Sequence, residues 1–549
     1  GPVRGLRALK GRNFIGVKLP GVAPPGCSVG FSRGLRLHGD QPVPIDSAED
    51  YSNALTSAGV TVERKERAEL IRSQLKASAD QLNGAPDCPE SLFEELVDLV
   101  ESPRLLQGAI ADRFLALPPE VIITVMQAHQ RYVPLKVPEV TPDPLQLEAK
   151  GVLQRDFLLV GNGLEAADAL ITRGNERVLA ARLADAEFFL SVDRRQPSSA
   201  RREALDRVTF AEGLGSLLDR CQRIERTARQ LVDQLNLDAH QGEAAIRAAH
   251  FCKHDLVSQM VGEFPELQGL MGGKYLLEEG EPKEVALAVV EHYLPRGAGD
   301  QLPSSDAGAV VALAERLELL LSIFAKGERP SGSSDPYALR RAGNGLLQIV
   351  WDRGWRLDLS RFLGSAVEDW AALFPEFAID SSALHQDLCQ LLRQRIVSQL
   401  EDEGFAPDLV QAVSAESVAT ERLLADPMDV RERLDLLNAL RQSKALPALM
   451  AVVQRAARLA EKGDLAETDL TVSAVVSPER FESPSETAMY EVLVQLEPLA
   501  SGRRYRELAE ALVQATPVLE AFFDGDDSVM VMADDPELRR NRLNLLGVL

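Results

Sequence analysis

Residues 171–189 read Ile171-Thr-Arg-Gly-Asn-Glu-Arg-Val-Leu-Ala-Ala-Arg-Leu-Ala-Asp-Ala-Glu-Phe-Phe189. The apolar side chains recur every three or four positions, and this spacing predicts an amphipathic helix over 176–190. The same period continues almost to the end of the chain, in 201–236, 243–262, 281–294, 306–326, 337–352, 384–404, 428–460, 484–497 and 503–523. The sequence therefore predicts a mainly α-helical fold.

The chain before residue 171 mixes helical and strand-like patterns. Helical spacing extends from Ser47 to about Leu82, with a break at Gly59, and it returns over 91–100. Residues 157–160, Phe-Leu-Leu-Val, are short, branched and apolar, which predicts a strand. Residues 121–126, Val-Ile-Ile-Thr-Val-Met, fit either a strand or a buried helical turn. We therefore expect an N-terminal α+β region.

Length and composition restrict the class of protein. The chain has 549 residues, of which 45% are apolar and 26% charged, and these values fit several globular domains and exclude global disorder. No apolar run approaches the ~20 residues needed to cross a bilayer. The five cysteines occur singly, so we expect a protein of the reducing cytoplasm. Because the net charge is −23, a nucleic-acid partner must be met by a local basic patch.

The common nucleotide-binding and hydrolase motifs are absent from the sequence. It contains no Gly-x-x-x-x-Gly-Lys-[Ser/Thr], no Gly-x-Gly-x-x-Gly after a strand, no Gly-x-Ser-x-Gly and no His-Glu-x-x-His. Gly161-Asn-Gly163 follows the predicted strand, but glycines around an asparagine are typical of a turn. We therefore name no catalytic residue in this chain.

His254 and Asp255 are the candidates for a metal site. Adjacent His and Asp on an apolar helix form the core of the HD phosphohydrolase pattern, in which both side chains ligate a metal ion that activates water. His240 or His250 is available as the earlier histidine, but the later Ala-Asp position reads Ala-Glu at 314–315. The alternative is a helical bundle in which His254 and Asp255 only cap a helix or pair with neighbouring groups. We expect no stoichiometric metal.

Basic residues gather in two segments. Between Ile171 and Gln230, twelve arginines stand against nine acidic residues, an excess of +3. Segment 441–460 has four cations and no acid: Arg441, Lys444, Arg455 and Arg458. At about 100° per residue these four fall within roughly 100° of arc, if Pro447 only kinks the helix. The sequence predicts one basic face, which either contacts phosphates or is simply solvated.

Longer motifs carry a family resemblance. Besides residues 171–189, they are Gln130-Arg-Tyr132, Leu214-Gly-Ser-Leu217, Glu263-Phe-Pro-Glu-Leu-Gln-Gly269, Glu291-His-Tyr-Leu-Pro-Arg296, Leu302-Pro-Ser-Ser305, Asp335-Pro-Tyr-Ala-Leu-Arg-Arg-Ala342, Val529-Met-Val-Met-Ala-Asp-Asp535 and Leu538-Arg-Arg-Asn-Arg-Leu543. Together they resemble the β subunit of bacterial heterotetrameric glycyl-tRNA synthetases. The resemblance covers about residues 50–549, whereas residues 1–49 match poorly and we expect them to be a truncated N-terminal segment.

The resemblance implies an architecture and a division of labour. It implies an α+β body at 50–204, a degenerate HD-type helical domain at 205–365, a helical linker at 366–424, and at 425–549 an anticodon-binding helical bundle similar to that of arginyl-tRNA synthetase. The β chains of this family bind tRNA(Gly), while the adenylate-forming site belongs to the α subunit of an α2β2 tetramer that uses ATP and Mg²⁺. We therefore expect the tRNA-binding subunit of a glycine–tRNA ligase, with no cofactor in this chain and no membrane partner.

The resemblance also implies where RNA binds, because a bundle that reads an anticodon needs arginines and sparse aromatics for splayed bases. The candidates are Arg441, Lys444, Arg455, Arg458, Tyr505, Arg539 and Arg542, with Arg173 and Arg177 in the first basic segment. Two other functions remain open. One is a metal-dependent phosphohydrolase centred on His254 and Asp255, and the other is a structural subunit that assembles the α subunit without touching RNA.

Overall fold

A computed structural model describes residues 8–15, 31–38, 42–141, 143–466 and 471–549. The described residues form two compact units. Unit 1 comprises those of Gly1–Glu225, Ala239–Tyr293 and Ala307–Val311, and unit 2 comprises Arg226–Asp238, Leu294–Asp306 and those of Ala312–Leu549. This division is coarser than the four domains implied by the resemblance, whose boundaries stay predictions.

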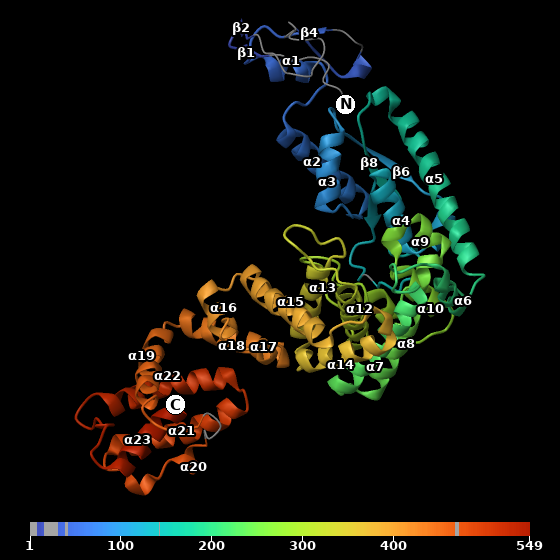
Figure 1. Cartoon of the computed structure of the whole chain (residues 1–549). Coiled ribbons are helices and arrows are strands. Elements are labelled where there is room, and N and C mark those ends of the chain that lie inside the picture. The colour runs from blue at the N-terminus through green and yellow to red at the C-terminus, as the bar shows by residue number, and fades with distance from the viewer. Residues whose placement is uncertain (1–7, 16–30, 39–41, 142, 467–470) are drawn as a thin grey trace. The chain divides into compact units, whose positions relative to one another are not determined.

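Unit 1 contains small antiparallel sheets (Figure 1). Near the N-terminus, β1 (Leu9–Lys10) pairs with β2 (Asn13–Phe14), and β3 (Phe31–Arg33) pairs with β4 (Pro42–Pro44). The largest sheet has the order β5 (Ala85–Pro86), β7 (Val133–Lys136), β8 (Leu153–Gly161) and β6 (Arg104–Ala109). The strand predicted at 157–160 is confirmed within β8.

The four-stranded sheet has a core on each face. Leu158 of β8 joins Ile71 and Phe93 on the side of α2 (Arg64–Leu82) and α3 (Glu90–Leu99). Its neighbours Phe157 and Leu159 join the core that includes α4 (Pro119–Thr124) and α5 (Asp168–Asp193). This alternation follows from the two-residue period of a strand. Residues 121–126 form the end of α4 and the start of a π-helical turn, η3 (Val125–Gln130), so the buried helical turn is the correct one of the two alternatives.

The helices of unit 1 are α1 (Tyr51–Ser57), α2 (Arg64–Leu82), α3 (Glu90–Leu99), α4 (Pro119–Thr124), α5 (Asp168–Asp193), α6 (Ser198–Ala204), α8 (Ala239–Phe251), α9 (Gln259–Glu263), α10 (Leu270–Glu278) and α11 (Lys283–Glu291). Two more, α7 (Leu217–Leu235) and α12 (Asp306–Ala325), have residues in both units. Two predicted continuous helices are wrong: 201–236 is interrupted between α6 and α7, and 243–262 is interrupted between α8 and α9.

The remaining helices belong to unit 2: α13 (Leu339–Arg353), α14 (Leu359–Leu373), α15 (Ser381–Asp402), α16 (Pro407–Ser414), α17 (Thr420–Ala425), α18 (Pro427–Gln442), α19 (Leu446–Ala460), α20 (Val472–Val475), α21 (Pro484–Ser501), α22 (Tyr505–Phe523) and α23 (Pro536–Val548). The prediction of a mainly helical fold is confirmed. No helix in the described part of the chain combines the length and apolarity that a membrane span requires.

Candidate RNA-binding surface and the His-Asp centre

The His-Asp pair lies in a short 3-10 turn, η6 (His254–Val257), that follows α8 in unit 1. Lys253, with φ at +67°, turns the chain out of the helix. Both side chains of the pair are fully buried. The neighbouring protein groups therefore determine the protonation and the hydrogen bonds of both side chains.

Asp255 caps the start of α10. Its Oδ2 atom accepts the backbone N–H groups of Gly269 at 2.6 Å and Gly272 at 2.9 Å. The buried Oδ1 atom has no hydrogen-bond partner among the described residues. Burial raises the pKa of this carboxyl, although the backbone donors act in the opposite direction. A carboxylate that takes two N–H groups at a helix start has a structural role without any metal ion.

His254 has both ring nitrogens engaged. Nε2 lies 3.2 Å from the carbonyl oxygen of Gly272, which can only accept, so Nε2 carries the proton. Nδ1 then accepts the Nε–H of Arg201 at 3.4 Å. Burial, and after it the charge of Arg201, lowers the pKa of His254 to about 3. The imidazole is thus neutral at physiological pH, and its lone pair is directed at a guanidinium.

Arg201 fills the space beside the pair. Its side chain is 1% exposed and its guanidinium lies 4.4 Å over the ring of Tyr275. The N–H groups donate to the carbonyl of Asp193 at 2.7 Å, to the carbonyl of Gln196, to Ser198 Oγ at 2.9 Å and to Glu279 at 3.2 Å. This arginine already supplies the centre with a bound positive charge.

The donor set does not fit a metal site of the HD type. In the part of the chain that the structure describes, no three His, Cys, Asp or Glu side chains are grouped to hold a metal ion. His250 Nδ1 instead pairs with Glu225 at 2.9 Å, and His240 is exposed at the start of α8. Glu315, the carboxylate at the later position, lies on α12 in unit 2.

The basic face predicted over 441–460 is wrong in two respects. The segment is two helices, because α18 ends at Gln442, Lys444 has φ at +61°, and Pro447 stands in the first turn of α19. Acids from elsewhere in the chain also reach it. Arg441 pairs with Asp408, with Nη1 2.9 Å from Oδ1, and Arg455 donates to Asp524 at 2.6 Å. The four cations therefore do not share one acid-free helical face.

Lys444 and Arg458 differ from the other two cations of that segment. Both are exposed, and neither has an ion-pair partner among the residues that the structure places. Arg455 also lies 4.7 Å over the ring of Phe523, which holds its guanidinium against the bundle. Lys444 and Arg458 are therefore the two cations of the segment best able to meet a phosphate.

Tyr505, the predicted aromatic contact, lines a groove of about 700 Å³ between α18 and α22. We call it the Tyr505 groove, and its lining residues are Glu432, Asp435, Leu436, Ala439, Leu440, Ser443, Arg503, Tyr505, Arg506, Ala509, Glu510, Val513 and Gln514. The Tyr505 hydroxyl donates to Asp429. Burial, and then the hydrogen bond to Asp429, raises the pKa of Tyr505 to about 12. The ring is thereby fixed at the start of α22.

The predicted C-terminal pair lies in α23. Arg542 is buried and donates to Glu486 at 2.8 Å, to Glu482 at 3.1 Å and to the carbonyl of Met530 at 3.1 Å. Arg539 is half-buried and donates to the carbonyl of Ala533 at 3.2 Å. Arg542 therefore holds the bundle together, and we leave it out of the proposed RNA surface.

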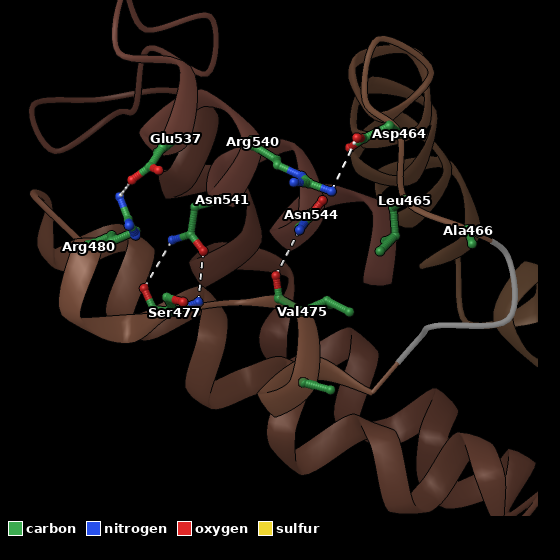
Figure 2. Close-up of a pocket in the computed structure, with 11 residues that line it drawn as sticks. Asp464, Leu465, Ala466, Val475, Ser477, Arg480, Glu537, Arg540, Asn541 and Asn544 are labelled. Carbon is green, nitrogen blue, oxygen red and sulfur yellow. Dashed lines mark hydrogen bonds and ion pairs between the residues drawn. The ribbon is translucent and has the colours of Figure 1, made fainter.

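A polar cavity of about 430 Å³ opens on the other side of α23, and Figure 2 shows two of its arginines paired with acids. Arg540 lies 3.2 Å from Asp464, and Arg480 lies 2.5 Å from Glu537. Asn541 exchanges hydrogen bonds with the backbone of Ser477, at 2.7 and 3.1 Å. Because the charges and the amide are satisfied internally, this cavity is a weaker anion site than the Tyr505 groove.

Arg173 and Arg177 lie on the exposed face of α5 in unit 1. Arg173 donates to the carbonyl of Ala169 at 3.2 Å, and Arg177 has no ion-pair partner in the described ranges. The structure therefore places the predicted cations on separate elements: two on α5, one on α18, two on α19, two on α23, and Lys444 in the turn between α18 and α19.

Sequence reasoning missed Arg503, Arg506 and Arg201. The first two border the Tyr505 groove, and the run Arg503-Arg-Tyr-Arg506 is a visible interleaving of basic and aromatic residues. Arg201 had no comparable signal, because it is one arginine among twelve in its segment and its burial depends on the tertiary fold.

Comparison with known proteins supplies the family. Residues 1–415 match the family model described as glycyl-tRNA synthetase beta subunit. The chain is 42% identical, over 555 residues, to the glycine–tRNA ligase beta subunit of Acaryochloris marina, in a match that covers 100% of this chain and 76% of the relative. The corresponding protein of Picosynechococcus is 41% identical, with 94% and 72% covered. That of Acidithiobacillus ferrooxidans is 38% identical, with 100% and 74% covered.

The family model matches from residue 1 and the Acaryochloris match covers the whole chain, so both include residues 1–49, which the motif-based resemblance left out. The family model covers more than half of the chain, and the chain covers more than two thirds of each of these relatives. On this evidence the chain belongs to the family of glycyl-tRNA synthetase β subunits, the β subunits of glycine–tRNA ligase.

Proposed function

We propose that this chain is the tRNA-binding subunit of a cytoplasmic glycine–tRNA ligase and works with a separate α subunit in an α2β2 tetramer. The α subunit forms the glycyl-adenylate from glycine and ATP with Mg²⁺, and this chain binds tRNA(Gly) through the helices of 425–549. The observation that carries the proposal is the Tyr505 groove, where a fixed aromatic ring and exposed cations meet.

Three acids and two arginines line the groove. Two of its acids are already paired, since Glu432 meets Arg356 at 2.6 Å and Asp435 lies 3.6 Å from Arg431. Arg506 has no ion-pair partner in the described part of unit 2. Lys444 follows the lining residue Ser443 directly in sequence. Arg503 is paired with Asp426 and Glu510 is a third acid of the lining, so Arg506 and the neighbouring Lys444 are the cations that RNA can meet without breaking an ion pair.

The groove also suits an unstacked base. Leu436, Ala439 and Val513 give it an apolar wall, and the hydroxyl bond to Asp429 holds the Tyr505 ring at its edge. Stacking of a base on an aromatic side chain contributes about 1–3 kcal/mol and does not depend strongly on which base is present. Single-stranded loops of RNA are bound by this combination of stacking and phosphate contacts.

The test separates binding from chemistry. The isolated chain is expected to bind tRNA(Gly) but to show no glycine-dependent ATP–pyrophosphate exchange, and exchange and glycylation should both appear when purified α subunit is added. Exchange by the isolated chain at the rate of the complex would contradict the division of labour. Absence of tRNA binding, together with full assembly of the complex, would favour a purely structural subunit.

A further inference from the structure

The exposed face of α5 carries a regular row of six residues, which we call the α5 seam: Leu170, Gly174, Arg177, Ala181, Ala184 and Phe188. Their spacing is 4, 3, 4, 3 and 4 residues, which is the pattern of a helix face that packs along a second helix. Five of the six side chains are apolar or small. The opposite face of α5 is already used, because Leu179, Leu183 and Leu190 pack into the core of unit 1.

The α5 seam is open at most of its positions, although Ala184 is partly buried against the core of unit 1. Leu170 is 70% exposed and Phe188 is 61% exposed. A side chain placed at Gly174 would have nothing within 4 Å, and Ala181 is exposed. Small residues between two large apolar ones leave room for a second backbone to approach. Contiguous apolar surface of this kind on a folded protein marks an interaction site.

The flanks of the seam are positively charged. Arg177, itself a member of the seam, and Arg173 beside it lie along one edge, and Arg177 has no ion-pair partner among the placed residues. Arg182, on the other edge, is 3.6 Å from Glu263. The exposed acid of this face is Asp185. A partner that is complementary in charge therefore brings acidic residues to the edge that holds Arg173 and Arg177.

From this geometry we propose that the α5 seam binds a helix of the α subunit, one with apolar residues at three- and four-residue spacing and acidic residues beside them. The inference rests on the proposed function, which supplies the α subunit as a partner. RNA is a poorer match, since exposed Leu170 and Phe188 gain nothing from a phosphate backbone. A second copy of this chain is also disfavoured, because each copy carries a net charge of −23.

The test uses the full-length chain and purified α subunit. Leu170→Asp with Phe188→Asp places a charge at each end of the seam, and the affinity for the α subunit should fall by at least about 100-fold, the size expected when two large apolar contacts of an interface are lost. The matched control is Leu70→Asp with Leu99→Asp, which changes two other exposed leucines of unit 1, at 42% and 57% exposure. The control should bind the α subunit as the unchanged chain does.

A charge variant and two further readouts make the outcome decisive. Arg173→Glu with Arg177→Glu should also weaken α-subunit binding, more at low salt than at high salt. In both seam variants the thermal midpoint of the isolated chain should stay unchanged, and in Leu170→Asp with Phe188→Asp its tRNA affinity should stay unchanged as well. Unchanged α-subunit binding, or a loss of tRNA affinity with the α subunit still bound, would overturn the inference. A halved mass of the isolated chain in the Asp variant would assign the seam to a second copy instead. Because tRNA binding by the unchanged chain is measured separately, failure of the proposed function is recognised independently.

Discussion

The Nε–H of Arg201 donates to Nδ1 of His254 across 3.4 Å, with both side chains buried. Nδ1 is the only ring nitrogen of His254 with a free lone pair, because Nε2 donates to the carbonyl of Gly272. A metal ion at this histidine would have to displace a guanidinium that also donates to four other residues. The relationship between these two residues leads us to expect that this HD-type sequence does not carry out HD-type chemistry.

The first prediction follows from that competition. The purified chain should contain no stoichiometric transition metal after exposure to Mn²⁺, Zn²⁺ or Fe²⁺, and it should not hydrolyse nucleotides on its own. Elemental analysis checks this directly. One metal ion per chain, lost in His254→Ala, would refute the prediction and restore the phosphohydrolase hypothesis.

The second prediction concerns acid stability. His254 has a pKa of about 3 in the folded chain, whereas an unperturbed histidine titrates near about 6.5. As the pH falls through this interval, the unfolded chain gains a proton that the folded chain does not, so stability is lost at up to ~1.4 kcal/mol per pH unit. Thermal midpoints of the unchanged chain and of His254→Asn should converge between pH 6 and pH 4. Asp255, whose raised pKa acts in the opposite direction, contributes in both proteins.

Helical periodicity predicted where helices occur, but it did not predict every place where they stop. The segment 428–460 has one apolar period throughout, yet the chain turns at Lys444, whose φ is +61°. Pro447 indicates this break, because proline is favoured in the first turn of a helix and disrupts its interior. Reading it as a helix start would have placed the break correctly. The interruption within 201–236 is marked not by the apolar period but by Gly213 and Gly215, both of which have φ at +80°.

The ion-pair partners of the candidate cations could not be predicted from the sequence. Asp408 and Asp524 lie 33 and 69 residues from the arginines that they pair with, so a local count of charges could not reveal them.

In α23, the positions of the arginines around the helix would have shown which of them is buried. Arg542 is four residues after the buried Leu538 and lies on the same face, whereas Arg540 points away from it. The sequence could therefore have identified Arg542 as buried, but not its partner Glu486.

The third prediction concerns the ion pair of Lys274 and Glu120, which are 2.9 Å apart. Burial lowers the pKa of Lys274 and raises that of Glu120, so each charge depends on the other. Lys274→Met or Glu120→Gln alone should destabilise the contact between α4 and the α10 region by about 2 kcal/mol, less than a fully enclosed pair because Glu120 is partly exposed. The double variant should lose less than the two single variants combined. Hydrogen exchange at the amides of α4 and α10 measures this locally, and additive losses would contradict the prediction.

The fourth prediction compares two arginines of one helix. Arg542→Met removes the partner of Glu486, which is 0% exposed, and should destabilise unit 2 by about 3 kcal/mol. Arg540→Met is the matched control, because its side chain is 68% exposed and such substitutions usually change stability by less than about 0.5 kcal/mol. Thermal unfolding of the two variants decides the matter. Equal midpoints would show that the Arg542 pair does not hold the bundle together.

The last prediction separates free cations from paired ones in RNA binding. Lys444→Glu with Arg458→Glu should weaken tRNA binding and flatten its dependence on salt by about 1.4 in log–log slope, since each phosphate contact on single-stranded RNA contributes about 0.7. Arg441→Glu with Arg455→Glu makes the same change in charge, but these arginines already pair with Asp408 and Asp524, so the effect should be smaller. Glycyl-adenylate formation by the α–β complex should stay intact in both. Titrations of tRNA at several salt concentrations measure both quantities. Equal losses of tRNA affinity in the two double variants would indicate only a general change in the electrostatic field of the chain. No loss of affinity in either would show that these cations of α18, α19 and the turn between them are simply solvated.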